Sequence, residues 1–151
     1  MTMSDAVDGF VQVTVAGQTF GIPVLGVQDV IAPVKIDAVP LAPPEVAGSL
    51  NLRGRIVTAI DLRRRLSAPP RGEADAHMCV IVERSGDLYA LQVDDVGDVL
   101  WLSRDDLVAT PVTIDAGWRA LCRGLHRLDD GLMLILDVDQ VLTLPTPSLA
   151  A

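Results

Sequence analysis

Aromatic residues, histidines and cysteines are scarce in this chain of 151 residues, which disfavours several classes of function. Phe, Trp and Tyr make up 3% of the sequence, and there are two histidines and two cysteines. Few side chains are therefore available for nucleophilic or acid–base catalysis, or for binding a metal ion. The two cysteines are consistent with reduced, structural thiols.

Long hydrophobic runs and net positive charge are also absent. No apolar run approaches the roughly 18 residues that a membrane span needs. Residues 1–8 lack the basic start and apolar centre of a signal peptide. We therefore expect a cytoplasmic protein without direct membrane insertion. The formal net charge of −8 disfavours nucleic acid as a partner, because a nucleic-acid binder presents a basic face to phosphates.

Aliphatic residues and turn-forming residues dominate the composition instead. Half of the chain is hydrophobic, and it contains 12 glycines and 10 prolines. Valine, isoleucine and leucine punctuated by glycine and proline are typical of many short strands joined by turns.

The sequence repeats itself in two segments. A shift of 69 positions places residues 11–30 on 80–99, and seven of the twenty aligned positions are then identical. A shift of 76 positions places residues 48–66 on 124–142, where two leucines, a glycine and an aspartate recur. The repeat predicts two copies of one β-unit, the second with a longer loop. Coincidence between valine-rich strands is the alternative.

Each copy can be divided into short strands. Residues 10–15 alternate, turn at 16–18 and return through 19–24, which is typical of a hairpin. We expect another strand at 27–34, and a strand over 50–62 that bends or turns at Arg53-Gly54-Arg55. Asp130-Gly131 is the corresponding hairpin signal in the second copy.

Short helical turns are expected at only two places, residues 42–47 and 137–142. Two units of four or five short strands each predict an all-β fold made of two small barrels.

The expected domain boundaries follow the polar segments. We predict an N-terminal tail at 1–9, a single domain at 10–144 and a C-terminal tail at 145–151. Within the domain, subdomain one covers about 10–68 and subdomain two about 77–144, with a linker at about 67–76.

Groups suited to chemistry do not converge in the sequence. His77, Cys79, Cys122 and His126 form the one conceivable metal set, but their spacings are not those of established zinc ligands. Acidic doublets occur at 94–95, 105–106 and 129–130, and neighbours on a strand point to opposite faces. We therefore predict no catalytic residues, no cofactor and no metal, and hence no enzyme.

One segment, residues 48–55, is not explained by strand formation alone. Asn51 and Arg53 flank Leu52 and are expected on the same side of a strand, while Gly54 permits a sharp turn. Arg53 would then be presented at a fixed place on a rigid element, which suits recognition of a partner. A solvated arginine in a turn is the alternative.

The run from Gly48 to Leu62 resembles the signature of the CheW family. In that family a Gly-x-x-Asn-x-Arg-Gly core is followed by an aliphatic run and Asp-Leu. Residues 27–31, 39–43, 93–99 and 134–139 are similar to further family segments, in family order, so the resemblance covers about 10–143. The chain departs from the family at Thr58-Ala59, where Pro-Val is usual, and at Asp29, where Glu is usual.

The resemblance implies a bacterial chemotaxis adaptor that acts in signal transduction without catalysis. It implies two SH3-like five-stranded β-barrel subdomains, related by internal duplication, with short helical turns. It also implies binding to the regulatory domain of a CheA-type histidine kinase and, in a groove between the barrels, to the hairpin tip of a chemoreceptor. Such an adaptor is cytoplasmic, is recruited to membrane-associated receptor arrays, and is a monomer outside them.

The resemblance also assigns residues to receptor or kinase contact. Carried over by position, these are Val27, Asp29, Gly48, Arg53, Gly54, Val96 and Val99, to which the strand pattern adds Asn51. Two other functions stay open. One is a CheW-like scaffold for another kinase pathway, such as motility or development. The other is a small β-barrel ligand-binding protein, which would need a convergent polar pocket.

Overall fold

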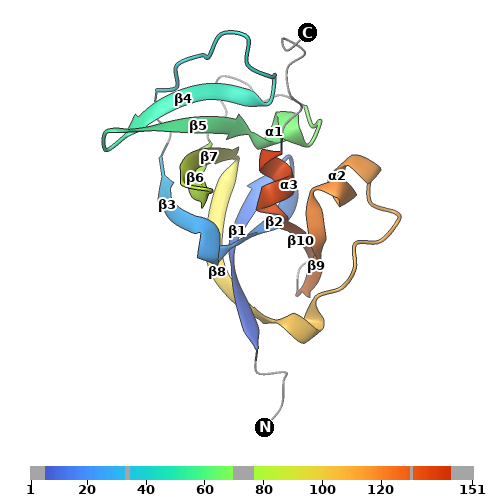
Figure 1. Ribbon diagram of the computed structural model, residues 1–151. Coiled ribbons are helices and arrows are strands. Elements are labelled where there is room, and N and C mark those ends of the chain that lie inside the picture. Colours follow the sequence, from blue (N-terminus) through green and yellow to red (C-terminus); the bar gives the residue numbers. More distant parts are fainter. Residues whose placement is uncertain (1–5, 33–34, 70–76, 130, 144–151) are drawn as a thin grey trace.

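The computed structural model describes residues 6–32, 35–69, 77–129 and 131–143, which form an all-β fold with a few short helices (Figure 1). The strands are β1 (Val7–Val15), β2 (Gln18–Pro23), β3 (Val27–Ile31), β4 (Val46–Leu52), β5 (Arg55–Asp61), β6 (Met78–Arg84), β7 (Asp87–Val93), β8 (Asp95–Ser103), β9 (Cys122–Leu128) and β10 (Gly131–Leu136). The helices are η2 (Val24–Gly26), α1 (Leu62–Arg65), η3 (Arg104–Asp106), α2 (Ala116–Ala120) and α3 (Val138–Leu142). The all-β prediction is confirmed.

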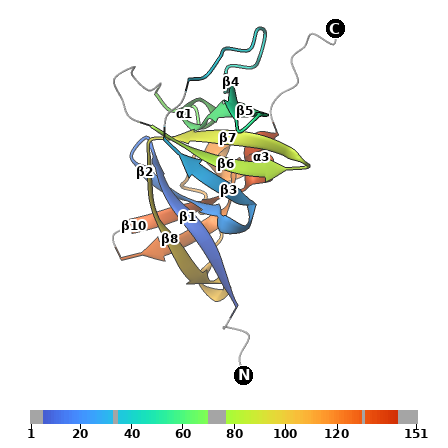
Figure 2. The same ribbon diagram turned by 90° about the vertical axis from the view of Figure 1, so that its left-hand side faces the viewer.

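The strands form two five-stranded sheets, and each sheet takes strands from both halves of the sequence. Sheet A has the order β8-β1-β2-β10-β9, and sheet B has the order β3-β6-β7-β5-β4. Figure 2 shows the two sheets stacked one above the other. Each sheet therefore combines strands from both of the segments 10–68 and 77–144, so that strands are exchanged between the two sequence segments.

The internal duplication is confirmed by this topology. Under the shifts of 69 and 76 positions, β1 to β5 correspond to β6 to β10, and this exchange converts the order of sheet A into that of sheet B. Two parallel pairs, β10 with β2 and β7 with β5, join strands from different copies within each sheet. The repeated unit thus completes its sheet only with strands of the other unit.

The sheets are open, so the expected closed barrels need correction. In the described residues, the edge strands β3 and β4 of sheet B are not paired with each other, nor are β8 and β9 of sheet A. Short bridges occupy the outer edges of β4 and β9 instead. They join Asp37 to Ser49 of β4 and Val108 to Leu125 of β9. The chain that follows β3 or β8 therefore takes up the backbone groups that closure would have used.

The main hydrophobic core lies between the two sheets. One face of the β1–β2 hairpin supplies Val11, Val13 and Phe20 to it, and the equivalent hairpin β6–β7 supplies Val80 and Leu91. Because side chains alternate along a strand, the opposite faces form two smaller clusters, one within each sheet. The alternating valines seen in the sequence therefore point into the core between the two sheets.

The helices α1 and α3 follow the equivalent strands β5 and β10 and lie next to each other (Figure 1). Each has an aspartate as its N-cap, Asp61 or Asp137, whose carboxylate accepts backbone hydrogen bonds from the first turn. The Arg65 guanidinium of α1 donates to the Val141 carbonyl of α3 at 2.9 Å. The expected helical turn at 137–142 is confirmed.

Several expected boundaries change. Strand β1 begins at Val7, inside the expected tail 1–9, because residues 7–9 pair with β8. Residues 42–47 do not form a helical turn. Residues 43–46 form a β-turn instead, in which the Val46 amide donates to the Pro43 carbonyl at 2.9 Å, and β4 begins at Val46. Linker residues 70–76, Asp130 and the tail 145–151 lie outside the described residues. The longest helices in the described ranges have five residues, too short to cross a membrane.

Candidate protein-interaction site

The β4–β5 hairpin places Arg53 at the tip of a tight turn. Arg53 and Gly54 have φ angles of 52° and 85°, and Leu52 pairs with Arg55 across the turn. Two positive φ angles in a two-residue loop match the twist of an antiparallel hairpin, which explains the glycine. The strand ends before Arg53, so the expectation that Asn51 and Arg53 share one side of a strand is wrong.

Asn51 stabilises this turn from within. Its side-chain oxygen accepts a hydrogen bond from the Gly54 amide at 2.9 Å. An asparagine that bonds the backbone three residues later favours a turn over a continuing strand. Asn51 therefore acts on the conformation of the turn that presents Arg53.

Arg53 forms an ion pair with Asp29 on β3. An Nη of Arg53 lies 3.0 Å from Oδ2 of Asp29, and the two side chains are 77% and 33% exposed. The other oxygen of Asp29 accepts the Val30 amide at 2.8 Å, which fixes the carboxylate on its own strand. The pair joins the edge strand β3 to the β4–β5 turn and leaves most of the Arg53 side chain facing solvent.

A small hollow of about 170 Å³ lies beside this ion pair. Its apolar lining comes from Leu52, Ile81 and Leu88, and its polar lining from Gln28, Asp29, Arg53 and Arg55. Its size suits a single side chain of a partner.

The three predicted valines lie on edge strands, on the faces that turn toward the shared core. Cross-strand neighbours occupy the same face of a sheet, and the neighbours here are all buried in that core. The pairs are Val27–Val82 on sheet B, and Val96–Val13 and Val99–Val11 on sheet A. Val99 is 44% exposed, and Val27 and Val96 are half-buried.

Val30 belongs with these valines but was not predicted. It pairs with Val80 of the core and occupies on β3 the position that Val99 occupies on β8. The shift of 69 positions aligns the two residues and was the signal that could have found it.

Gly48 shapes the backbone and is buried. Its φ is 152°, and a Cβ at this position would overlap the carbonyl oxygen of Asp37. Gly124, its equivalent in the other copy, lies in the same way against Val108, whose carbonyl oxygen would be 2.6 Å from a Cβ. Both glycines permit the short bridges at the sheet edges, so Gly48 has a structural role.

The ion pair occurs in one copy of the repeat. Asp98 and Asp129 of sheet A occupy the positions of Asp29 and Arg53, and two carboxylates do not attract each other. The two ends of the molecule therefore differ in charge although they share a topology.

Residues suited to metal binding or catalysis stay apart. Cys79 lies on β6 of sheet B, whereas Cys122 and His126 lie on β9 of sheet A. Within the described residues there is no group of three or more His, Cys, Asp or Glu side chains that could hold a metal ion. Burial raises the pKa of the Cys122 thiol to about 11, opposite to the shift that activates a nucleophile.

His126 is buried against an aromatic ring. Its ring centroid lies 5.5 Å from that of Phe10. Burial lowers the pKa of His126, while the carboxylates of Asp106 and Asp8 act in the opposite direction. His126 therefore belongs to the packing of sheet A.

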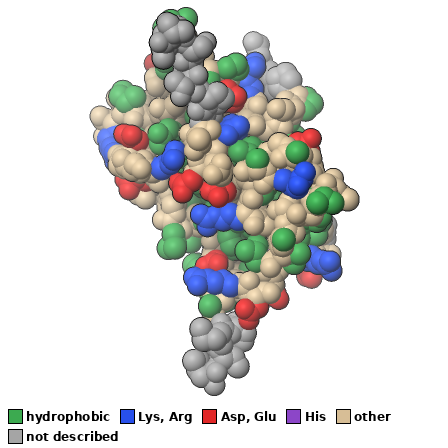
Figure 3. All heavy atoms as spheres, turned by 45° about the vertical axis from the view of Figure 1, so that its right-hand side comes forward, with side chains coloured by type: hydrophobic (Ala, Val, Ile, Leu, Met, Phe, Trp, Pro, Cys, Tyr) green, Lys and Arg blue, Asp and Glu red, His purple; other side chains and the backbone are tan. Residues whose placement is uncertain are grey.

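Charges of both signs are interspersed on the face drawn in Figure 3. Lys and Arg side chains there lie next to Asp and Glu side chains, with hydrophobic side chains between them. This face has no field of one sign, unlike the basic surface that binds phosphates.

Comparisons with known proteins agree with this architecture. The family model described as CheW-like domain matches residues 9–145. A chemotaxis protein CheW from Thermotoga maritima is 28% identical over 144 residues, covering 93% of each chain. A chemotaxis protein CheW from Rhizobium meliloti is 25% identical over 127 residues, which covers 84% of this chain and 82% of that protein.

A solved structure has the same fold. The crystal structure of a scaffolding protein CheW from Thermoanaerobacter tengcongensis superposes with a TM-score of 0.81 at 28% identity. The superposition covers 92% of this chain and 90% of that one.

Proposed function

Since this chain belongs to the CheW-like domain family, we propose that it is a chemotaxis adaptor that couples a CheA-type histidine kinase to chemoreceptor tips. Its role is to hold two proteins together, without catalysis of its own. The observation that carries the proposal is the Arg53–Asp29 ion pair, which presents a largely exposed guanidinium at the tip of a rigid hairpin.

The receptor site consists of an apolar face and a charged rim. Val27, Val96 and Val99 supply aliphatic surface on the edge strands, where an amphipathic receptor helix can pack its apolar side. Arg53 supplies charge-assisted hydrogen bonds to a carboxylate or a terminal carbonyl of that helix. Asp29 orients Arg53, and Gly54 and Asn51 set the turn that carries it.

The kinase partner is the regulatory domain of a CheA-type protein. Two sheets of equal topology but different end charges provide two distinct surfaces, which suits an adaptor with two different partners. The protein is cytoplasmic, enters membrane-associated receptor arrays through these contacts, and is a monomer outside them. Size-exclusion chromatography with light scattering tests the monomer.

Two other functions predict different partners. A CheW-like scaffold of a motility or developmental pathway would co-purify with a kinase of that pathway in place of the chemotaxis kinase. A small ligand-binding protein would retain a small molecule. The hollow beside Arg53, at about 170 Å³, is smaller than the roughly 300–1,000 Å³ of ligand pockets, whereas a hollow of about 340 Å³ beside His126 falls within that range, so retention of a small molecule by the purified protein is the test.

Arg53→Ala tests the receptor site. The exposed position predicts a folded variant with unchanged thermal unfolding, and the loss of an anchoring arginine predicts at least 10-fold weaker binding to a receptor hairpin fragment from the same genome. The measurement is isothermal titration calorimetry. Arg127→Ala, which removes an exposed arginine from β9, is the matched control and should leave receptor affinity unchanged. Equal affinity of the Arg53→Ala variant and the wild type would refute the proposed site.

A further inference from the structure

Trp101 is a large hydrophobic side chain with an unusual exposure. It lies on β8, an edge strand of sheet A, and is 63% exposed. The other tryptophan, Trp118, is held in place by two contacts: its indole N–H donates to the Leu66 carbonyl at 2.8 Å, and its ring lies 5.5 Å from that of Phe20. Tryptophan side chains are enriched at protein interfaces, so an exposed indole such as that of Trp101 indicates a surface that binds a partner.

The position of the Trp101 ring is set by Gly9 on β1. Gly9 is its cross-strand neighbour, and a Cβ on Gly9 would lie 2.7–2.9 Å from three carbons of the six-membered ring. The glycine therefore lets the ring pack directly on the backbone of β1. Less side-chain entropy is lost when a partner binds a ring that already has a fixed seat.

Trp101 continues the valine face of the proposed receptor site. Leu100 and Leu102 pack against the smaller hydrophobic cluster within sheet A. Because side chains alternate along a strand, Val99 and Trp101 lie on the opposite face of β8. The cross-strand pair Gly9–Trp101 follows the pair Val11–Val99 along the same face.

We propose that Trp101 anchors an amphipathic helix of the receptor tip and extends the receptor site beyond Val99. The inference rests on the proposed function and adds to it a residue that determines affinity. An apolar side chain of the helix packs on the outer face of the indole, and a second one, a turn away, packs on Val99.

The geometry of the strand suits a helix. Alternate residues of a strand are about 6.6–6.8 Å apart, and residues i and i+4 of a helix are about 6 Å apart along its axis. A helix aligned with β8 can therefore place successive apolar side chains on Val99 and Trp101.

The charge of the chain disfavours a second copy of this protein as the partner that covers Val99 and Trp101. Each copy carries a formal net charge of −8, and the exposed Asp95 and Asp98 lie on the same strand as Trp101. Like charges that meet at an interface repel, whereas a helix with Lys or Arg beside its apolar positions is attracted.

Trp101→Ala tests the anchor, with Leu25→Ala as the matched control. Leu25 is 94% exposed and lies on η2, not on β8, so its replacement removes a comparable exposed side chain from a different element. With the full chain and a receptor hairpin fragment from the same genome, Trp101→Ala should weaken binding at least 10-fold, and Leu25→Ala less than 2-fold. Affinity for the kinase regulatory domain should stay the same in both variants.

Fluorescence of the wild type supplies a second measurement. Adding the receptor fragment should shift the tryptophan emission to the blue and reduce acrylamide quenching, and the Trp101→Phe variant should lose this change while still folding. Trp118 is already packed and contributes a constant signal.

Each other outcome overturns the inference. If Arg53→Ala weakens receptor binding but Trp101→Ala does not, the proposed function stands and the anchor is wrong. If Trp101→Ala weakens only kinase binding, or converts a dimer of the wild type into a monomer, the face has a different occupant. If the wild type binds no receptor fragment, the proposed function and the anchor both fail.

Discussion

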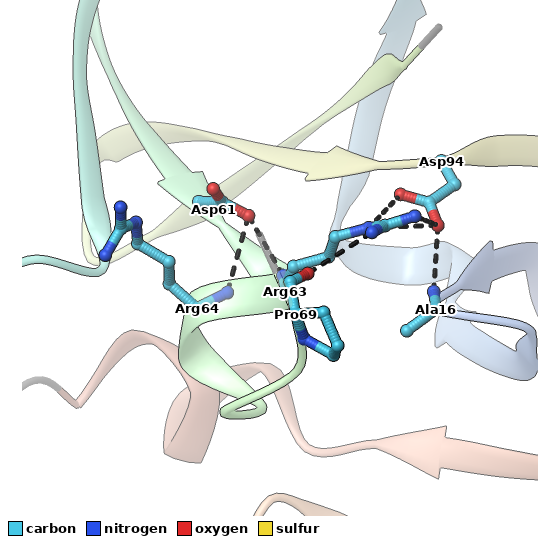
Figure 4. Close-up of polar contacts among 6 residues, drawn as sticks. All are labelled: Ala16, Asp61, Arg63, Arg64, Pro69 and Asp94. Atoms are coloured by element: carbon cyan, nitrogen blue, oxygen red, sulfur yellow. Dashed lines mark hydrogen bonds and ion pairs between the residues drawn. The ribbon is translucent and has the colours of Figure 1, made fainter. Parts of the chain in front are cut away.

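Arg63 and Asp94 form a two-pronged ion pair that joins α1 to sheet A (Figure 4). Nε of Arg63 lies 2.9 Å from one carboxylate oxygen and Nη2 lies 2.7 Å from the other. The Asp94 carboxylate also accepts the amide of Ala16, in the β1–β2 turn, at 2.8 Å. The contact therefore ties the β1–β2 hairpin of sheet A to α1, the helix that follows β5 of sheet B.

A second, weaker contact occupies the equivalent place in the other copy. Asp139 of α3 corresponds to Arg63, and it pairs with Arg84, near the β6–β7 turn, at 3.3 Å. The side chains of Arg63 and Asp94 are 19% and 18% exposed, whereas those of Arg84 and Asp139 are 36% and 68% exposed. Each of the helices α1 and α3 thus carries an ion pair at the same position, but Arg84 is not the equivalent of Asp94, and the two pairs differ in burial.

Replacing Arg63 should be costly for stability. Arg63→Gln removes the guanidinium from a mostly buried carboxylate, which should lower the free energy of unfolding by about 2 kcal/mol. Arg84→Gln removes an exposed pair and should cost less than about 1 kcal/mol. Urea unfolding followed by circular dichroism measures both, and equal losses in the two variants would contradict the role of burial.

Replacing Gly48 should strain the edge of sheet B. Gly48→Ala forces a side chain into the Asp37 carbonyl at a φ of 152°, and should lower the free energy of unfolding by about 3 kcal/mol. Gly26→Ala is the control, because no atom lies within 4 Å of its Cβ position, and it should change stability by less than about 0.5 kcal/mol. The measurement is again urea unfolding, and an unchanged midpoint for Gly48→Ala would exclude the close backbone approach.

Stability should fall when the solution becomes mildly acidic. The pKa of His126 is lowered in the folded protein, so the unfolded chain takes up a proton near its ordinary pKa of 6.5 before the folded chain does. The stabilising contribution is complete above pH 6.5 and is lost as the pH falls below it, by at most about 1.4 kcal/mol per pH unit. Unfolding free energies at pH 7.5 and 5.5 should differ less in His126→Gln than in the wild type. If the unfolding free energy depends on pH equally in His126→Gln and in the wild type, groups other than His126 cause the dependence.

The Cys122 thiol should react slowly in the folded protein. A pKa of about 11 in place of 9.0 reduces the thiolate fraction at pH 8 roughly 100-fold. We expect slow modification by Ellman's reagent in the folded state and fast modification of both thiols in urea, since Cys79 is buried as well. Loss of the slow native phase in Cys122→Ser identifies the residue, and fast native labelling of Cys122 would contradict its burial.

Much of the fold could be predicted from local patterns. The alternation of Val11 and Val13, the turn at Arg53-Gly54 and the helical turn at 137–142 depend on neighbours in the chain, and all three are confirmed. The helical turn expected at 42–47 is wrong because β4 begins within that segment, at Val46. The role of Asn51 was also missed, since its amide bonds the backbone of its own turn.

The ion pairs could not be predicted, because they join residues far apart in sequence. Asp29 and Arg53 meet only because sheet B curls until its two edges, at β3 and β4, approach each other. The exposure of Trp101 could not be predicted from the sequence either. Its exposure follows from its place on an edge strand opposite Gly9.

The sequence by itself determined the strands, the duplication and the family, because periodicity, turn residues and a signature segment are local features. Only the tertiary structure decided which strands share a sheet. Two copies with the same pattern can pair their strands within a copy or between copies, and local propensity is equal in both arrangements. The exchange of strands is decided by the joint burial of Val11, Val13 and Phe20 against Val80 and Leu91, and this core exists only once both copies are in place.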